Sequence, residues 1–305
     1  MTDKKIAVLV PCYNEAQTIA KVVADFKREI PQAEIYVYDN NSKDATFAIA
    51  KEAGAIVRKE SRQGKGNVVR SMLRDIEADF YVLIDGDDTY PAESVQALLQ
   101  EAELGADVVV GDRLSNGTYT RENKRDFHTF GNGLVLFLIN HLYDVKLKDI
   151  MSGYRVFSRR FVKTYPALCE GFQLETDMTI FALSRKLKIQ EVPIIYRDRP
   201  AGSESKLNTF SDGFRVLTTI FNLYRYFYPL RYFSLVAAIF FLVGVSFGIP
   251  VVVEFIETRF VSKVPSAILA SGLMVLAIIS FSNGLILDSI NKSDQEEFER
   301  HLKKR

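Results

Sequence analysis

Three carboxylates stand close together in the stretch 85–88 (Asp-Gly-Asp-Asp). They follow the apolar run 80–84, which is rich in strand formers, and they precede a helical pattern over 92–104. Ligands of open α/β sheets bind where strands end, and crowded carboxylates are unfavourable unless they share a cation. A hard divalent ion, with diphosphate oxygens in its remaining positions, would relieve the repulsion. A solvated acidic turn is the alternative interpretation of this stretch alone.

The elements around this stretch follow a repeated strand-helix order. The pattern predicts strands at 6–10, 34–38, 55–58, 80–84, 107–111 and 191–196, and helices between them at 45–53, 67–76 and 92–104 among others. Such alternation is typical of a mostly parallel, doubly wound α/β sheet. The polar segments 11–15, 39–44 and 85–91 each follow a strand, so we expect them at one edge of that sheet.

Composition narrows the classes of function. With 39 basic and 38 acidic residues the net charge is +1, which gives no sign of bulk nucleic-acid binding. Two cysteines and three histidines leave no disulfide framework and no zinc constellation. The first strand is not followed by a P-loop or a G-x-G-x-x-G motif, which argues against a nucleotide hydrolase or a dehydrogenase. It ends instead in Asn14 and Glu15, groups suited to hydroxyls and amides of a nucleoside.

Two long uncharged segments lie in the last third of the chain. Residues 232–253 and 264–287 contain 22 and 24 residues without a charge, and each is long enough to span a bilayer. The short linker between them predicts a helical hairpin, with two buried core helices as the disfavoured alternative. The stretch 208–232 is rich in aromatic residues and arginine, so we expect an interfacial amphipathic helix there, a soluble core helix being its alternative.

Four motifs occur in an order and spacing that resemble family 2 glycosyltransferases of the GT-A fold. They are Pro11-Cys12-Tyr13-Asn14-Glu15, Asp39 to Thr46, Gly64-Lys65-Gly66 and Asp85-Gly86-Asp87. The chain is more closely similar to the polyprenyl-phosphate glycosyltransferases, the dolichol-phosphate mannose synthase and GtrB-like group. The resemblance covers residues 6 to about 207, and the two-helix tail matches the GtrB-like subgroup. It implies a GT-A domain at 1–207, an amphipathic interfacial region at 208–232, and a transmembrane hairpin with a charged tail at 233–305.

The resemblance assigns the donor side of the site. It implies that Asp87 binds Mg²⁺ or Mn²⁺ directly, with Asp85 supporting the metal. Thr89 stands where the dolichol enzymes often carry Gln, so a third side-chain ligand stays open. Asn40 replaces the second carboxylate of the family's nucleoside-binding element, in which Asp39 keeps its role. The residues expected to bind the donor nucleotide are Pro11, Tyr13, Asn14, Glu15, Asp39, Lys65 and Asp85.

The acceptor side follows from the same resemblance. The stretch 149–155 matches a family element, and Asp149 is expected near the sugar or the acceptor. The expected catalytic residues are Asp87, Asp149, Arg113 and Arg125. Those expected to bind the acceptor phosphate are Arg113, Arg121, Arg125, Ser152, Arg155 and Lys206. A solvated basic face is the alternative for Arg113, Arg121 and Arg125. For Glu175, at a family acidic position, a structural role is equally open.

The resemblance implies inverting transfer of a sugar, a hexose, from a UDP-sugar to polyprenyl (undecaprenyl) phosphate. The product would serve cell-envelope or glycan modification. A GDP-mannose donor and a non-catalytic membrane scaffold that kept the fold are the alternatives. A processive polysaccharide synthase is disfavoured because its Gln-x-x-Arg-Trp element cannot exist in a chain without Trp.

The expected partners are the nucleotide sugar, polyprenyl phosphate and the lipid bilayer, with no nucleic acid. A homo-oligomer, a downstream flippase and a second glycosyltransferase are left open. Basic residues precede the first apolar segment and follow the second, so the positive-inside rule places both termini and the catalytic domain on the cytoplasmic side of the plasma (inner) membrane, crossed more than once.

Overall fold

The computed structural model describes residues 4–115, 126–168, 174–197, 218, 221–222, 224–226 and 228–303. The chain divides into two compact units, Met1–Leu217 and Thr218–Arg305. Most of the predicted interfacial region 208–232 lies outside the described residues, so that helix stays a prediction.

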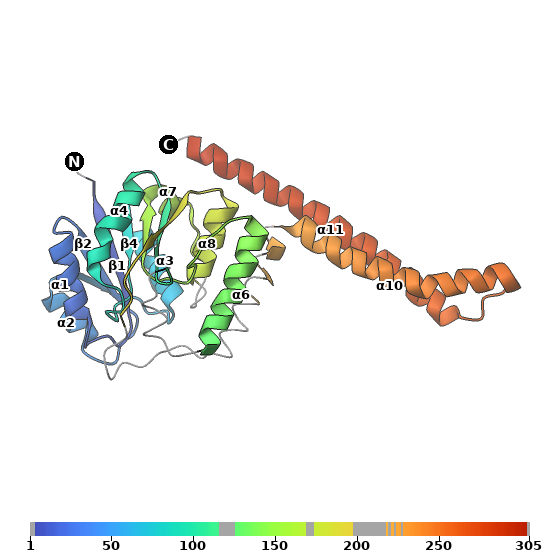
Figure 1. Ribbon diagram of the computed structural model, residues 1–305, viewed down its shortest axis with the longest axis horizontal. Helices are drawn as coiled ribbons and strands as arrows, with labels where there is room; N and C mark the ends of the chain where they lie inside the picture. The colour runs from blue at the N-terminus through green and yellow to red at the C-terminus, as the bar shows by residue number, and fades with distance from the viewer. Residues whose placement is uncertain are drawn as a thin grey trace. The chain divides into compact units, whose positions relative to one another are not determined.

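The first unit is built, within the described ranges, on a seven-stranded sheet (Figure 1). The strands are β1 (Ile6–Cys12), β2 (Glu34–Asp39), β3 (Ile56–Lys59), β4 (Phe80–Leu83), β5 (Val108–Asp112), β6 (Arg155–Ser158) and β7 (Ile189–Pro193). They lie in the order β3-β2-β1-β4-β6-β5-β7. β1 is parallel to β2 and β4, and β5 is parallel to β7, whereas β6 is antiparallel to both of its neighbours. The predicted mostly parallel sheet is confirmed, and the sequence missed β6.

Helices cover the sheet. They are α1 (Ile19–Glu29), α2 (Thr46–Glu52), α3 (Lys65–Asp75), the 3₁₀ turn η1 (Ala92–Ser94), α4 (Val95–Glu103), α6 (Asp126–Tyr143), α7 (Arg159–Thr164) and α8 (Leu174–Ser184). Strand side chains alternate between faces: Val8, Val82 and Val156 join the core that contains α1 and α4. On the other face Phe157 stacks on Phe161 of α7, with ring centroids 4.7 Å apart. Burial on both faces explains why the central strands are apolar throughout.

The switch in strand order positions the site. β2 and β3 lie on one side of β1 and β4 lies on the other, so the strand order reverses its direction across the sheet at β1. In parallel strands the carboxyl ends point the same way, so the turns after β1, β2 and β4 share one edge. Register pairs Cys12 with Asp39 at that edge.

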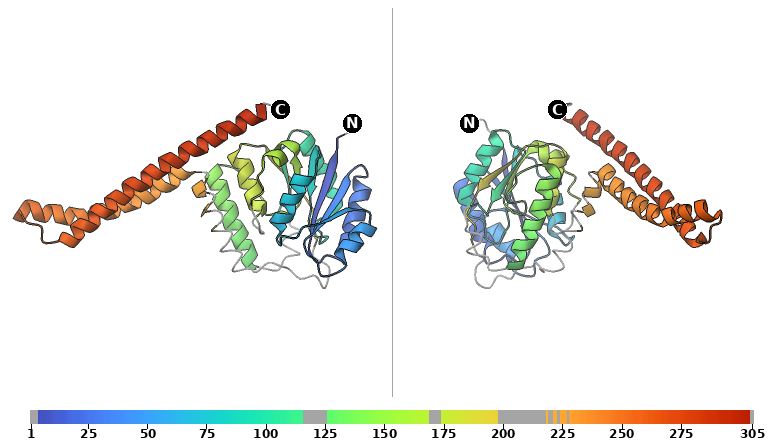
Figure 2. Two further views of the ribbon diagram at one scale, coloured as in Figure 1. Left: turned by 180° about the vertical axis from the view of Figure 1, so that it is seen from behind. Right: turned by 45° about the vertical axis from the view of Figure 1, so that its right-hand side comes forward.

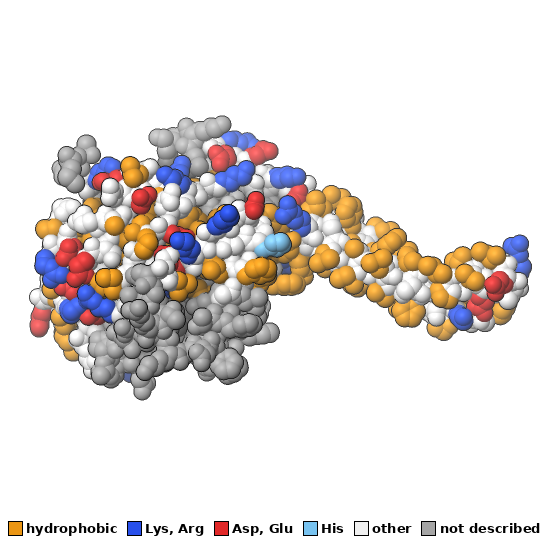
Figure 3. Space-filling model, viewed as in Figure 1, with side chains coloured by type: hydrophobic (Ala, Val, Ile, Leu, Met, Phe, Trp, Pro, Cys, Tyr) orange, Lys and Arg blue, Asp and Glu red, His pale blue; other side chains and the backbone are white. Residues whose placement is uncertain are grey.

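The second unit is a pair of long helices that run side by side (Figures 1 and 2). α10 covers Pro229–Thr258 and α11 covers Val264–Lys303. Both are long and apolar enough to cross a membrane, and little of either is buried within the structure. Hydrophobic side chains predominate along the middle of the pair on the face that Figure 3 shows, with charged side chains at its far end. Gly244 lets the helices approach, because a Cβ there would lie 3.2 Å from that of Leu273.

Candidate functional site

The turns after β1 and β2 are tied to each other by side chains. Asn14 has a left-handed backbone (φ 54°), its backbone N–H donates to Ser42 Oγ at 2.9 Å, and its Oδ1 accepts the backbone N–H of Lys43 at 2.8 Å. The backbone N–H of Glu15 donates to Thr46 Oγ1 at 2.8 Å. Asn14 therefore builds the wall of the predicted nucleotide site, and its contact with the donor stays a prediction.

Asp39 ends β2 with a carboxylate suited to a ligand. The residue is 2% exposed, and its Oδ1 has no hydrogen-bond partner in the described part of the chain. A buried, unpartnered acceptor is costly unless something binds it. Asp39 therefore offers a buried acceptor at this edge of the sheet, and its hydrogen bond with a nucleoside stays a prediction.

Asn40 joins this turn to the loop that precedes α3, a role the sequence did not reveal. Its Nδ2 donates to the carbonyls of Glu60 and Arg62 at 3.0 and 2.8 Å, and its Oδ1 accepts the backbone N–H of Gly64 at 2.8 Å. A hydrogen bond from Ser71 lowers the pKa of Glu60 to about 2, which keeps that carboxylate charged in the same loop. The loop is therefore fixed immediately before Lys65.

The three carboxylates of the acidic turn point to different partners. Asp85 Oδ1 lies 2.5 Å from Lys65 Nζ. Asp87, which is buried, accepts the Thr89 hydroxyl at 2.7 Å through its Oδ1. Asp88 (φ 59°) forms an ion pair with Lys21 of α1 at 2.6 Å. Asp88 therefore anchors the turn to α1, while Asp85 is paired with Lys65 and Asp87 with Thr89.

Lys65, the first residue of α3, bridges two carboxylates. Besides Asp85 it contacts Glu175 of α8, with Nζ to Oε1 at 2.7 Å. Burial alone would lower the pKa of Lys65, but the charges of Asp85 and Glu175 outweigh it and raise that pKa. The ammonium is therefore a permanent positive charge beside the acidic turn.

The donor set of the acidic turn fits a cation that substrate completes. Within the described ranges, no three His, Cys, Asp or Glu side chains are grouped to hold a metal ion. Asp85 and Asp87 nevertheless offer carboxylate oxygens, and Mg²⁺ is often bound by one or two carboxylates together with substrate phosphates. The residues present therefore fit Mg²⁺ or Mn²⁺ only with a diphosphate as co-ligand.

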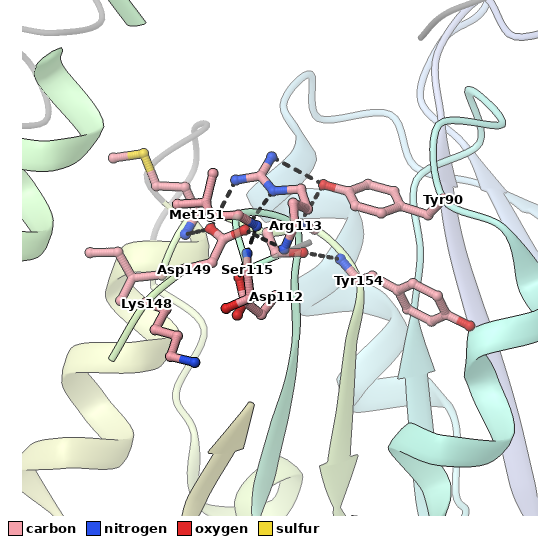
Figure 4. A network of polar contacts seen from close by, with 12 residues as sticks. Tyr90, Asp112, Arg113, Ser115, Lys148, Asp149, Met151 and Tyr154 are labelled. Carbon is pink, nitrogen blue, oxygen red and sulfur yellow. Dashed lines mark hydrogen bonds and ion pairs between the residues drawn. The ribbon is translucent and has the colours of Figure 1, made fainter. Parts of the chain in front are cut away.

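Arg113 and Asp149 form a bidentate pair (Figure 4). The guanidinium donates from Nε to Oδ2 at 2.7 Å and from Nη2 to Oδ1 at 2.9 Å, and its Nη1 donates to the Tyr90 hydroxyl at 3.3 Å. Burial would raise the pKa of Asp149, but Arg113 outweighs it and holds that pKa below its usual value. Burial raises the pKa of Tyr90 to about 12, so its hydroxyl stays neutral. The structure brings the two predicted residues together, and their roles toward substrate stay predictions.

Glu191 of β7 holds the backbone that carries Asp149, a role that the sequence did not reveal. Its Oε1 accepts the backbone N–H groups of Lys148 and Asp149, both at 2.8 Å. Burial raises the pKa of Glu191, and the charges of Asp112 and Asp149 act in the same direction. The carboxylate thereby holds the segment that carries Asp149.

Arg155, expected at the acceptor phosphate, is fully buried in β6. Its Nε donates to Ser152 O, its Nη1 to Thr179 Oγ1 and its Nη2 to Ile150 O, at 2.9, 2.9 and 2.6 Å. Burial lowers its pKa. Ser152 is also fully buried. Because neither side chain reaches the surface, we propose that they position the 150–153 turn in place of touching phosphate.

Gly153 brings this turn against the acidic turn. A Cβ at Gly153 would lie 2.4 Å from Asp85 Oδ2, so any other residue there would displace the Asp85 carboxylate. Its backbone N–H donates to the Tyr90 hydroxyl at 3.1 Å. Of the other predicted residues, Pro11 in β1 and Tyr13 just after that strand are half-buried. Arg121, Arg125 and Lys206 lie outside the described residues.

A mostly parallel sheet with an acidic turn and a lysine at the carboxyl ends of its strands is the GT-A architecture, that of a large class of sugar transferases. The model of the family described as glycosyl transferase family 2 matches residues 7–165, and the chain belongs to that family.

Two relatives from Haloferax volcanii are similar to this chain. One is named glycosyltransferase AglJ, with 31% identity over 98% of each chain. The other is named dolichyl-phosphate hexose transferase, with 33% identity over 70% of this chain and 90% of the relative. Among solved structures, glucosyl-3-phosphoglycerate synthase from Mycobacterium tuberculosis, in complex with Mn²⁺, uridine diphosphate and phosphoglyceric acid, has a TM-score of 0.58 at 20% identity over 72% of this chain and 78% of that one. At that identity the likeness concerns the fold.

Proposed function

We propose that this protein transfers a hexose, with inversion, from a nucleotide sugar to a polyprenyl phosphate. The observation that carries the proposal is the juxtaposition of Asp85, Asp87 and Lys65 at one edge of the sheet. Two oxygen-ligand groups and a permanent ammonium are the chemistry needed to hold a diphosphate leaving group. Family membership and the relative named dolichyl-phosphate hexose transferase support the sugar and the lipid phosphate.

The donor would lie along the turns after β1, β2 and β4. Asp39 would accept a hydrogen bond from the base, because its buried Oδ1 has no partner among the described residues. The half-buried Pro11 and Tyr13 would line the base, with Glu15 close to the nucleoside. We propose a UDP-sugar as donor, and the solved complex with uridine diphosphate and Mn²⁺ on the same fold supports that choice.

Mg²⁺ or Mn²⁺, when bound with the diphosphate at Asp85 and Asp87, would supply positive charge to the leaving group. Lys65 contributes a second positive charge, held in place by its own carboxylate partners. Thr89 orients Asp87 by donating its hydroxyl to Oδ1. Preorganised charge of this kind stabilises a transition state without reorganisation at the moment of reaction.

The acceptor supplies its own nucleophile. A phosphate monoester is anionic near pH 7, so one of its oxygens can bond to the anomeric carbon as the bond from that carbon to the diphosphate oxygen breaks. No strong general base is needed, and placement supplies much of the rate. Arg113, held by Asp149 and Tyr90, and Arg125 are the proposed groups that orient the acceptor phosphate.

Two apolar helices in the same chain support a lipid acceptor. α10 and α11 are long enough to cross a bilayer, and a polyprenyl phosphate presents its charged group at the membrane surface. We propose that both termini face the cytoplasm, because basic residues flank the outer ends of the hairpin. A reporter fused after Arg305 that is active only outside the cytoplasm would contradict this orientation.

A donor screen tests the proposal. Full-length protein in lipid nanodiscs that contain undecaprenyl phosphate would be supplied with UDP-sugars and GDP-mannose, and release of nucleoside diphosphate would be followed. We expect release with one UDP-hexose only when the lipid phosphate and a divalent cation are present. Turnover with GDP-mannose and with no UDP-sugar would show that the donor is GDP-mannose. No turnover with any donor, together with no nucleotide binding, would favour a non-catalytic membrane scaffold.

A further inference from the structure

Glu175 lies outside the motifs that suggested the donor site, yet it contacts that site. Its Oε1 is 2.7 Å from Lys65 Nζ, while Asp85 Oδ1 is 2.5 Å from the same nitrogen. The Glu175 and Lys65 side chains are only 9% and 14% exposed. The ammonium therefore has two carboxylate partners from different elements, the turn after β4 and helix α8.

Of these two carboxylates, only Asp85 has a second proposed role. Asp85, with Asp87, is the proposed support of a divalent cation. A cation at that point takes up the charge of Asp85 and repels the Lys65 ammonium. A largely buried ammonium that lost its only counter-charge would leave the site, because burying an unpaired charge is costly. Glu175 prevents this loss, since its bond to Lys65 does not involve Asp85.

The position of Glu175 is fixed by buried contacts of its own helix. The backbone carbonyl of Glu175 accepts the hydroxyl of Thr179 at 2.9 Å, and Thr179 in turn accepts Arg155 Nη1 at 2.9 Å. Arg155 is fully buried. The carboxylate is therefore presented from a rigid element and not from a mobile surface segment.

We propose that Glu175 is a positioning residue for the donor diphosphate: it holds the Lys65 ammonium in the site once Asp85 is engaged by a divalent cation. The assignment rests on the proposed function, because it requires a diphosphate and a cation at this edge of the sheet. A purely structural role would make Glu175 necessary for folding whether or not nucleotide and cation are bound.

The test uses full-length protein in nanodiscs and compares Glu175→Gln, Glu175→Asp and Lys65→Met with wild type. Asp177→Asn is the matched control, because Asp177 is a carboxylate on the same helix whose Oδ2 accepts the Tyr165 hydroxyl at 2.6 Å, away from Lys65. UDP and GDP affinities are measured by calorimetry at saturating Mn²⁺. Binding of Mn²⁺ without nucleotide is measured by electron paramagnetic resonance, and thermal unfolding reports the fold.

For Glu175→Gln we expect UDP affinity to fall on the order of tenfold, as for loss of a hydrogen bond between charged groups. Glu175→Asp should recover part of it, and Asp177→Asn should match wild type. Lys65→Met should bind Mn²⁺ more tightly, because the competing ammonium is gone, while binding UDP more weakly.

Unchanged UDP affinity in Glu175→Gln would overturn the proposal. So would a Glu175→Asp variant that unfolds early and binds no better than Glu175→Gln, since that result indicates a structural role. Wild-type protein that binds neither UDP nor GDP would remove the proposed donor site itself, and this assignment with it.

Discussion

Replacing Gly153 by alanine should damage the donor site without unfolding the protein. The new Cβ would lie 2.4 Å from Asp85 Oδ2 and 3.1 Å from its Cγ. Gly153 is not among the residues with positive φ, so contact and not backbone strain is the cost. Restoring an ordinary van der Waals distance requires Asp85 to move by about 1 Å, and a misplacement of that size can cost about 10²-fold in rate. Its carboxylate would also leave the 2.5 Å contact with Lys65.

The assay is the rate of nucleoside diphosphate release at saturating donor, with the thermal unfolding midpoint as control. Overpacking of this kind costs about 1–3 kcal/mol of stability, so the variant should remain folded at 25 °C. Gly272→Ala is the matched variant, because a Cβ there meets nothing within 4 Å. A Gly153→Ala protein with wild-type rate and midpoint would refute the close approach of the two turns.

Three further predictions concern the charged groups. Asp87→Asn should lower transfer by at least about 10²-fold, the scale of losing one preorganised stabilising group, with the fold intact; full activity without added metal would contradict the cation site. Asp149→Asn should lower the free energy of unfolding by about 3–5 kcal/mol, because it leaves the buried Arg113 guanidinium without its carboxylate partner. Since the folded pKa of Asp149 is lowered, its contribution is present above the unfolded value of about 4 and lost as pH falls through the folded pKa; urea titrations at pH 3–7 should show a steeper acid loss in wild type than in the variant, and parallel profiles would refute this. Arg125→Ala should impair use of polyprenyl phosphate more than Arg125→Lys does, and shift UDP affinity by less than about 1 kcal/mol; lost UDP binding with an unchanged acceptor KM would reverse the two phosphate assignments.

The sheet could be predicted because burial on both faces leaves a local signal. Runs such as Ile6–Val10 are apolar at every position, and helical spacing between them completes the alternation. β6 was missed because its four residues, Arg155–Ser158, begin with a buried arginine and end with a serine. Its antiparallel place between β4 and β5 depends on long-range pairing that no local pattern contains.

The site residues were named by motif, but their partnerships were not. Lys65 and Glu175 are 110 positions apart in the chain, and the Arg113–Asp149 pair spans 36. Nothing in either segment's composition shows that the fold brings them within hydrogen-bond distance. Arg155 was expected at the acceptor phosphate because the stretch 149–155 matches a family element, and such a match does not show that the side chain is fully buried.

We propose that the enzyme moves a sugar, and not a sugar phosphate, to the lipid phosphate. Mass spectrometry of the lipid fraction, after reaction of full-length protein with undecaprenyl phosphate and the preferred donor, tests it most directly. We expect a lipid with one added hexose joined through a single phosphate, formed in equal amount to the UDP released. A lipid with a diphosphate link and release of UMP, or release of UDP with no new lipid, would contradict the account.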